Sequence, residues 1–459
     1  MAKYKAYPEY KDSGVEWLGE IPIHWNRTAL KRLCSLTTGL TPPTHREDYY
    51  AEEGHPWIRP EDLNEHGLYT YATKYVSDTG WNLLRHIKPN STLVCCIGTI
   101  GKCGYVEQTV STNQQVTAAT FHNSGRYYFY VFKASRTQLE ELATGNVLKI
   151  LNCERLGSLS VVKVDHKEAD SIAKFLDYET IKIDNLIEKQ LQLIELLKEK
   201  RQAMISHAVT KGLDPDVPMK DSGVEWLGQV PTHWSISKVR YCFLFDKGLT
   251  ITKENLQDEG IPCINYGEIH SKHGFEINPN IHKLKYVNET HLKNDKNSLL
   301  IKGDIIFADT SEDVDGSGNF SQLTTDSSIF AGYHTIIARP IDRQNYRFLA
   351  YLFDCQELRS QIKHAVKGVK VFSITQAILR GLSIWLPPTN EQESISKLLD
   401  YQTAKIDTLI QKQRQQIDLL KERRTALIAA AVTGKIDLRD WTPPASSTEA
   451  SFTTEEATA

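Results

Sequence analysis

Apolar positions along the chain form two long stretches with a seven-residue repeat. Their seam residues are spaced alternately by four and three positions. The first seam comprises Leu176, Thr180, Ile183, Ile187, Gln190, Ile194, Leu197, Arg201 and Met204, and the second comprises Leu399, Thr403, Ile406, Ile410, Gln413, Ile417, Leu420, Arg424 and Leu427. This spacing predicts a coiled-coil seam of about four heptads in each stretch. Neither stretch contains Pro or Gly, so we expect helices of about 35–40 residues that end near Gly212 and Gly434.

Both predicted seams carry a Gln in the middle and an Arg further along. A polar residue at a seam position costs stability but fixes the register and the choice of partner. Because the same two residue types recur in both seams, we expect the helices to pair with each other, and a pseudo-twofold repeat then requires antiparallel packing. The alternative is that each helix packs on its own domain or on the helices of a partner protein.

The stretches belong to an internal repeat. Lys11–Trp25 reads KDSGVEWLGEIPIHW and Lys220–Trp234 reads KDSGVEWLGQVPTHW, with twelve of fifteen positions identical at an offset of 209 residues. The helical stretches repeat at an offset of 223, so the block between leader and helix is 14 residues longer in the second half. The order leader, variable block, helix therefore occurs twice, which indicates a duplication of two large units.

We predict that the variable blocks have a mixed α/β fold. The expected strands are 91–97, 115–121, 158–164, 304–308, 335–338 and 382–386, and the expected helices are 126–142 and 346–366. The overall fold class is thus α/β (α+β), with two such domains joined by two long helices that form an antiparallel coiled coil. The predicted divisions are a leader (1–25), a first domain (26–165), a long helix (166–212), a second leader (213–234), a second domain (235–388), a second long helix (389–437) and a disordered acidic tail (438–459).

Composition and charge narrow the possible environments. The 459 residues carry a formal net charge of −3, and removing the four acids of the last twenty residues leaves a nearly neutral body. A near-neutral total neither indicates nor excludes nucleic acid, because a basic patch can lie within it. No apolar run approaches the roughly 18 residues of a transmembrane helix, and the start has no signal-peptide core. We therefore expect a cytoplasmic protein without membrane contact, whose eight cysteines are reduced thiols.

Sequence motifs for catalysis are missing. Gly98–Gly104 (GTIGKCG) has the wrong spacing for a phosphate-binding P-loop, and no HExxH or CxxC occurs. The acid pair Asp304 and Asp309 lacks the downstream Glu-x-Lys of a restriction-type nuclease core. We therefore predict no catalytic residue, no metal site and no cofactor in this chain, which favours a binding protein over an enzyme.

The leader tryptophans Trp17, Trp25, Trp226 and Trp234 could stack on bases. Their spacing is the same in both copies, whereas the variable blocks differ. A residue that reads a sequence should vary with the block, so we expect the tryptophans to anchor each leader to its helix or domain.

The repeated leader, both helices and the exits AVTKGLDPD (208–216) and AVTGKIDLRD (431–440) resemble the specificity subunit of type I restriction-modification enzymes. The resemblance covers almost the whole chain. The segment LPPTNEQE (386–393) before the second helix also resembles the family's helix start, whereas the first half departs from it with VVKVDHKE (161–168).

This resemblance implies a non-catalytic subunit that specifies where a complex acts. Each variable block would be a target recognition domain reading one half of an asymmetric, split sequence in double-stranded DNA. The long helices would separate the two domains and dock two methyltransferase subunits, and restriction subunits would join them. Methylation would occur at adenine N6, with S-adenosylmethionine, ATP and Mg bound by the partner subunits.

Loop residues of both blocks are candidates for contact with DNA, because Gly-rich loops with Lys, Ser, Thr, Asn and Gln suit phosphates and groove edges. In the first block these are Thr99, Lys102, Asn113, Gln114 and Gln115, in a pattern (GxIGK…NQQ) like that of the family. The second block offers Thr310, Ser311, Asp313, Ser317 and His334, and Lys149 and Lys370 lie in matching places. The alternatives are a turn and strand start that support the fold, and lysines that are merely solvated.

Two other functions remain open at this point. One is a coiled-coil interaction scaffold without a DNA role. Such a scaffold would have no reason to keep the leader and the long helix in both halves while the variable blocks between them diverge. A self-contained methyltransferase or nuclease would need the cofactor or metal motifs that the sequence lacks.

Overall fold

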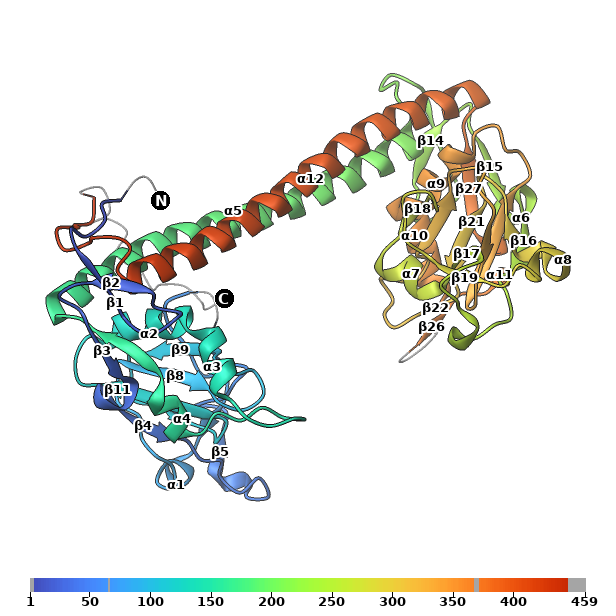
Figure 1. The fold of residues 1–459 in the computed structure, drawn as a ribbon. Coiled ribbons are helices and arrows are strands. Elements are labelled where there is room, and N and C mark those ends of the chain that lie inside the picture. The colour runs from blue at the N-terminus through green and yellow to red at the C-terminus, as the bar shows by residue number, and fades with distance from the viewer. Residues whose placement is uncertain (1–3, 65–66, 367–370, 445–459) are drawn as a thin grey trace. The chain divides into compact units, whose positions relative to one another are not determined.

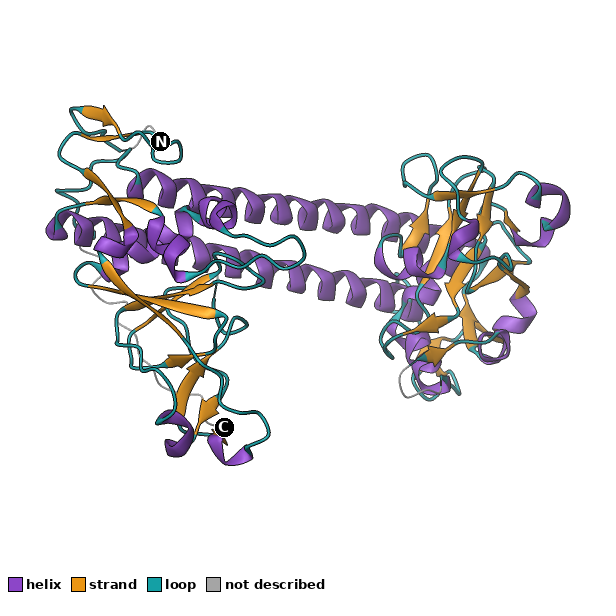
Figure 2. Cartoon of the chain, turned by 60° about the horizontal axis from the view of Figure 1, so that its bottom comes forward, coloured by secondary structure: helices purple, strands orange, loops and turns teal. Residues whose placement is uncertain are grey.

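The computed structural model describes residues 4–64, 67–366 and 371–444, and it divides the chain into two compact units. Unit 1 comprises Met1–Gln192 and Gln413–Ala459, and unit 2 comprises Leu193–Lys412. Each unit therefore contains one leader, one mixed α/β domain and part of both long helices (Figures 1 and 2). We describe the units separately.

The domain of unit 1 is built on a four-stranded antiparallel sheet in the order β4-β11-β8-β9, beside a second sheet in the order β10-β6-β7-β5. Two further antiparallel pairs, β1-β2 and β12-β3, complete its strands. The strand bounds are β1 Tyr10–Asp12, β2 Glu20–Pro22, β3 Asn26–Ala29, β4 Cys34–Thr38, β5 Tyr50–Ala51, β6 His55–Ile58, β7 Tyr75–Val76, β8 Ser91–Cys95, β9 Cys103–Val106, β10 Ser111–Thr112, β11 Val116–Phe121 and β12 Ser160–Lys163. The helices are η1 Leu30–Arg32, η2 Glu47–Tyr49, α1 Asp78–Trp81, α2 Gly125–Ala134, α3 Arg136–Leu142 and α4 Cys153–Ser158.

The domain of unit 2 has a five-stranded sheet in the order β16-β25-β21-β23-β18 and a second sheet in the order β19-β17-β24-β20. Its strands are β13 Met219–Asp221, β14 Gln229–Pro231, β15 Ser235–Lys238, β16 Phe243–Lys247, β17 Ile261–Ile264, β18 Phe275–Ile277, β19 Lys285–Val287, β20 Leu299–Leu300, β21 Ile305–Ala308, β22 Thr310–Ser311, β23 Phe320–Leu323, β24 Ile329–Ala331, β25 Thr335–Pro340, β26 Phe372–Ser373 and β27 Ser383–Leu386. Its helices are α6 Val239–Cys242, η3 Lys253–Asn255, α7 Tyr266–Ser271, α8 His291–Asn294, η4 Lys296–Ser298, α9 Tyr346–Asp354, α10 Gln356–Ala365 and α11 Gln376–Gly381.

The two domains share a topology that their dissimilar sequences did not reveal. In each, one central strand lies antiparallel between two neighbours, β11 between β4 and β8 in unit 1 and β25 between β16 and β21 in unit 2. A parallel contact also recurs, β10 with β6 and β24 with β17. All six predicted strands and both predicted helical segments are present, although each helical segment is broken into two helices.

The long helices are α5, His166–Lys211, and α12, Thr389–Val432. At 46 and 44 residues they exceed the predicted 35–40, because their polar first turns lie outside the apolar repeat that defined the prediction. Gly212 follows α5 at φ +79° and Gly434 follows α12 at φ +73°. This left-handed conformation is the usual end of a helix and is open to glycine without strain, so the predicted stops are confirmed.

Within each unit the two helices pack antiparallel, as Figures 1 and 2 also show. In unit 1 the guanidinium of Arg424 lies 3.0 Å from the carboxylate of Asp184, and in unit 2 that of Arg201 lies 3.3 Å from Asp407. The 223-residue repeat converts one pair into the other, as expected for a pseudo-twofold duplication. Every predicted seam residue is buried or half-buried, including both glutamines. The predicted intramolecular pairing is therefore observed.

A matching group of side chains fastens each domain to its helix. In unit 1, Arg126 Nε donates to Asp177 at 2.8 Å, and the Tyr130 hydroxyl donates to the same carboxylate at 2.6 Å and lies 3.2 Å from Thr180 Oγ1. In unit 2 the corresponding residues are Arg347, Tyr351, Asp400 and Thr403, at 2.7, 2.7 and 3.2 Å. The two seam threonines thus meet a tyrosine of the domain, which explains a hydroxyl at a buried position.

The leaders are held at the start of each long helix. Trp25 Nε1 donates to Glu168 at 3.1 Å, and Trp234 Nε1 donates to Glu391 at 3.2 Å. The first half therefore keeps an acid at the same position of its helix start although the surrounding sequence has changed. Trp17 Nε1 donates to the Ser160 carbonyl, so three tryptophans act as anchors as predicted. Trp226 differs, since it is 41% exposed and stacks on the ring of His364.

The end of α12 leads into a segment that packs on unit 1. Leu438 is buried, and the Trp441 ring meets Phe175 edge-on at 5.4 Å between centroids. The segment from 438 was predicted to be disordered; its first residues are instead held by apolar contacts that the acidic composition concealed. Residues 445–459 of the predicted tail lie outside the described residues. All eight cysteines are described and are free thiols.

Candidate nucleic-acid interface

Three segments of unit 1 meet at the end of β8. The β8–β9 loop (96–102) contains Thr99 and Lys102, and the β10–β11 turn (113–115) contains the predicted amides. The backbone amide of Cys96 donates to the Gln115 carbonyl at 2.7 Å, which joins loop and turn. The α3–α4 loop (143–152), which carries Lys149, joins at the same point because Leu151 N donates to the Cys96 carbonyl at 2.9 Å.

The predicted residues of unit 1 differ in how freely they can meet a ligand. Thr99, Gln114 and Lys149 are exposed. Lys102 is half-buried and its ammonium donates to the Pro60 carbonyl at 2.9 Å, so part of its hydrogen-bonding capacity serves the fold. Asn113 is buried, and its amide nitrogen donates to Gln115 Oε1 at 3.0 Å. The Asn113–Gln115 contact holds the turn in shape and leaves Gln114 at its exposed corner.

The same convergence occurs in unit 2 at Asp309. There the β21–β23 loop (309–319) and the β24–β25 turn (332–334) are joined by the Asp309 amide, which donates to the His334 carbonyl at 3.1 Å. The third segment, which runs from β26 to α11, joins at this point because Ile374 N donates to the Asp309 carbonyl at 2.8 Å. His334 is exposed and has φ +55°, and its Nδ1 lies 3.2 Å from Asp309 Oδ1. This carboxylate fixes the direction of the imidazole.

Of the other predicted residues in unit 2, Thr310 is half-buried and Asp313 is exposed on the β21–β23 loop, while Ser311 is buried. Ser317 is fully buried and its hydroxyl donates to the Asp313 carbonyl. This position corrects the prediction for Ser317, which supports the loop from inside. Gly318, at φ +87°, lets the backbone turn directly after it. Lys370 lies outside the described residues.

A cavity of about 680 Å³ adjoins the β21–β23 loop. It is lined by Tyr266, Gly267, His270, Thr310, Ser311, Glu312, Asp313, Asp315, Gly316, Asn319 and Val371. His270 Nδ1 lies 3.0 Å from the Asn319 amide nitrogen, which can only donate, so Nε2 carries the proton and donates to the Thr310 carbonyl at 2.7 Å. Sequence reasoning missed Tyr266 and His270, because α7 precedes the loop by some forty residues and only the fold brings them together.

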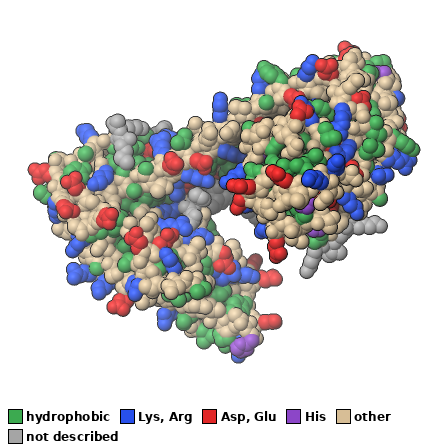
Figure 3. Space-filling view, turned by 45° about the vertical axis from the view of Figure 1, so that its right-hand side comes forward, with side chains coloured by type: hydrophobic (Ala, Val, Ile, Leu, Met, Phe, Trp, Pro, Cys, Tyr) green, Lys and Arg blue, Asp and Glu red, His purple; other side chains and the backbone are tan. Residues whose placement is uncertain are grey.

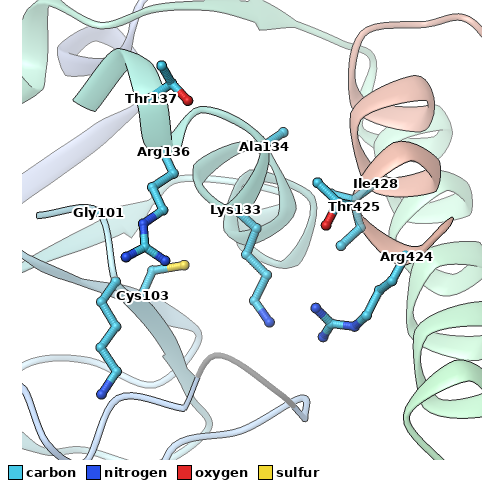
Figure 4. Close-up of a pocket in the computed structure, with 10 residues that line it drawn as sticks. Gly101, Cys103, Lys133, Ala134, Arg136, Thr137, Arg424, Thr425 and Ile428 are labelled. Atoms are coloured by element: carbon cyan, nitrogen blue, oxygen red, sulfur yellow. The ribbon is translucent and has the colours of Figure 1, made fainter. Parts of the chain in front are cut away.

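Unit 1 has a different cavity, of about 370 Å³, behind its β8–β9 loop. It is lined by Gly101, Lys102, Cys103, Lys133, Ala134, Arg136, Thr137, Arg424, Thr425 and Ile428. Figure 4 shows Lys133 and Arg424 extending into it from α2 and α12. Burial lowers the pKa of Lys133 to about 8. The described lining thus combines four basic residues, in contrast to the acid-rich cavity of unit 2.

The acids once considered for nuclease chemistry have a structural role. Asp304 is fully buried and accepts hydrogen bonds from Arg339 at 2.6 Å and from Arg343 at 2.7 Å. Asp309 holds His334. Among residues 4–64, 67–366 and 371–444, no group of three or more His, Cys, Asp or Glu side chains is placed to hold a metal ion.

Surface charge does not by itself identify a binding face. On the side seen in Figure 3, basic and acidic side chains are interspersed within each unit, in keeping with the near-neutral total. Within the part of the chain that the structure describes, no helix has the length and apolar character needed to cross a membrane. The convergence of loops at one strand end, rather than net charge, is what marks the candidate interface.

Comparison with known proteins agrees with this architecture. The family described as type I restriction modification DNA specificity domain matches residues 22–196 and 231–419. The type I restriction enzyme MjaIX specificity subunit of Methanocaldococcus jannaschii is 23% identical over 462 residues, covering 96% of this chain and 99% of that protein. The StySPI specificity subunit of Salmonella potsdam is 20% identical over 432 residues, covering 91% and 90%.

A solved structure described as "Structural basis underlying complex assembly and conformational transition of the type I R-M system" has the same fold. It matches with a TM-score of 0.68 at 13% identity, covering 91% of this chain and 99% of that one. The two family matches lie one in each half and together span most of the chain. This chain therefore belongs to the type I restriction modification DNA specificity family.

Proposed function

We propose that this chain specifies the DNA target of a type I restriction-modification complex, with each domain reading one half of an asymmetric, bipartite site. The observation that carries the proposal is the convergence of three segments at the same strand end in both domains. The backbone connections are the same, at Cys96 in unit 1 and at Asp309 in unit 2. The side chains presented there differ, as two readers of different half-sites require.

The exposed loop side chains of unit 1 and of unit 2 suit different half-sites. Unit 1 presents Thr99, Gln114 and Lys149, and the Gln114 amide nitrogen can donate to a base edge while its Oε1 accepts from the Thr41 hydroxyl. Unit 2 presents Asp313 and His334, which can accept from or donate to base edges in the major groove. Because these sets are unlike, the target should be asymmetric rather than palindromic.

The complex would divide its work between subunits. This chain would not be catalytic and would bind no cofactor. Two methyltransferase subunits would bind S-adenosylmethionine and methylate adenine N6, and restriction subunits would use ATP and Mg in the cytoplasm. Docking on the long helices is supported by exposed leucines that correspond under the repeat, Leu186 with Leu409 and Leu196 with Leu419. An adenine must leave the base stack to be methylated, so the complex has to hold the DNA firmly on both sides of that adenine. Two DNA-reading domains in one subunit would provide such contacts.

The test is to purify the chain alone and with a methyltransferase subunit encoded beside it. The chain alone should neither methylate DNA, hydrolyse ATP nor cut DNA, and the complex should methylate adenines in one asymmetric, split motif found by long-read sequencing. Turnover by the chain free of other subunits would contradict the proposal.

A coiled-coil scaffold without a DNA role makes a different prediction for loop variants of the same complex. For a scaffold, replacing Thr310 and Asp313 by Ala should leave the methylated motif unchanged. For a specificity subunit, the replacement should alter one half of the motif and leave the other half intact.

A further inference from the structure

Large apolar side chains are exposed at the tip of the α3–α4 loop in unit 1. Val147 is 102% exposed, Leu148 51% and Ile150 43%. In Figure 1 this loop extends from the domain beside α3 and α4. Single exposed apolar residues are ordinary, but three within four residues at a projecting tip indicate a surface that something else covers.

The tip is fixed to the candidate interface by its own backbone. Thr144 and Ile150 exchange two hydrogen bonds, at 3.0 and 2.7 Å, which close the tip into a narrow loop. Ile150 also forms a β-bridge with Ile97 in the β8–β9 loop. The exposed side chains are therefore held next to the loop that carries Thr99.

Unit 2 has the same construction with other residues. There β26 pairs with β22, and the partners Ser373 and Thr310 correspond to Ile150 and Ile97. Val371, just before β26, is 54% exposed and corresponds to Leu148 under the 223-residue repeat. The same repeat matches Lys149 with Phe372, which corrects the predicted match of Lys149 with Lys370. An exposed apolar residue at one place in two domains of unlike sequence indicates a shared contact.

The charge around the tip favours a polyanion as the partner. Residues 143–151 contain no acid, and Lys149 is exposed beside the apolar pair. Apolar side chains that enter a DNA groove contact thymine methyl groups or wedge between base steps. A neighbouring lysine can meet the phosphate of the same strand.

We propose that Val147 and Leu148 make apolar contacts with the bases of the half-site read by unit 1, and that Lys149 meets an adjacent phosphate of the double-stranded DNA. The inference rests on the proposed function and adds to it a class of contact that hydrogen-bonding residues do not supply. Val371 makes the equivalent contact for the other half-site.

The experiment uses the complex with methyltransferase subunits and a duplex carrying the mapped target. Replacing Val147 and Leu148 together by Ser should weaken binding about ten- to hundred-fold, as expected when two buried apolar contacts are lost. The slope of log affinity against log salt should stay unchanged, because no phosphate contact is removed. Lys149→Ala should instead lower that slope by about one unit and weaken binding to any sequence.

The matched control is Ile341→Ser. Ile341 is also an exposed apolar residue, at 59%, but it lies at the opposite end of β25 from the 332–334 turn of the candidate interface. It should leave DNA affinity unchanged. Wild-type affinity in the Val147/Leu148 variant would overturn the inference, and simultaneous loss of methyltransferase subunits in native mass spectrometry would assign the tip to protein docking instead. If the wild-type complex shows no preference for the mapped target, the proposed function itself fails.

Discussion

Units 1 and 2 have different side-chain contacts at matching positions of their paired central strands. In unit 1, Ser91 lies opposite Thr120 and their hydroxyls are 2.7 Å apart. In unit 2 the same position holds the buried ion pair of Asp304 and Arg339, at 2.6 Å. The backbone arrangement therefore does not depend on one kind of side-chain contact. It depends on features common to both units, namely the central strand between two neighbours and the anchor to the long helix.

The contrast extends to the surface between domain and helix. In unit 2, Asp354 of α9 lies 3.3 Å from the seam residue Arg201. Lys133 of α2 takes the place of this acid in unit 1, where it lines a cavity together with the matching seam arginine, Arg424. Between the domain and its helix, the Arg–Asp–Tyr–Thr anchor is the same in both units. The comparison teaches that the frame needs few fixed contacts, which leaves the rest of each domain free to diverge.

The strongest way to break this comparison is to exchange a whole domain. Replacing residues 26–165 by the corresponding block of another family member should change one entire half of the methylated motif and leave the other half as it was. The reason is that the leader and the helix residues of the anchor, Asp177 and Thr180, lie outside the block and need not change with it. Long-read methylation maps of cells that produce the hybrid complex provide the measurement. A well-folded hybrid that loses both half-site specificities would show that the domains are not independent.

The next largest effect should be on stability, from breaking the Asp304–Arg339 ion pair of unit 2 or the matching Ser91–Thr120 contact of unit 1. Asp304→Ala leaves two arginines beside a buried, unoccupied position and should destabilise unit 2 by about 3–5 kcal/mol. Ser91→Ala removes a hydroxyl that contacts the Lys88 carbonyl and the Thr120 hydroxyl, and it should destabilise unit 1 by about 1 kcal/mol. Native-state hydrogen exchange of the central strands reports each unit separately. Equal losses at the two sites would mean that the ion pair contributes no more than the hydroxyl pair.

The frame was accessible to sequence reasoning because it is periodic or repeated. Alternating spacings of four and three residues gave the α5 and α12 seams, and the glycines after them marked the ends. The shared topology of the domains was not accessible, because β11 and β25 match in hydrogen-bond register and not in residue identity. For the candidate interface, sequence reasoning singled out loops that the structure brings together, but Tyr266, His270 and the exposed tip at Val147 depend on contacts between distant segments. Ser317 was misplaced because its exposure depends on how the loop turns.

The leader anchors provide a smaller contrast between units. Glu168 accepts hydrogen bonds from Tyr7 at 2.7 Å and from Trp25 at 3.1 Å and lies 3.0 Å from His24 Nε2. Glu391 has the corresponding His233 and Trp234 but is more exposed, at 25% against 7% of the side chain. Glu168→Ala should therefore cost about 2–3 kcal/mol and Glu391→Ala about 1–2 kcal/mol. Thermal unfolding midpoints rank the two variants, and the reverse order would contradict this account of the leaders.

The smallest predicted effect is a pH-dependent change in stability caused by Lys133 in the basic cavity of unit 1. Burial lowers the pKa of Lys133 to about 8, below its usual value of 10.5. Between these two values the unfolded chain binds the proton and the folded chain does not, so stability contributed by this group rises as the pH increases from about 8 to 10. Lys133→Met removes the titration without removing the apolar stem. Relative to this variant, the wild-type protein should gain about 1–2 kcal/mol across that window.

Urea unfolding at pH 7.5, 8.5 and 9.5 measures this difference, with Asp354→Asn in unit 2 as the matched control because it removes a charge from the corresponding position. The control should show no such difference from wild type between pH 8 and 10, since both proteins keep Lys133. If the wild-type protein and Lys133→Met change in parallel with pH, Lys133 keeps its proton throughout. The cavity of unit 1 would then hold a charged lysine at the place where unit 2 holds an acid, and the contrast between the two units would be one of charge alone.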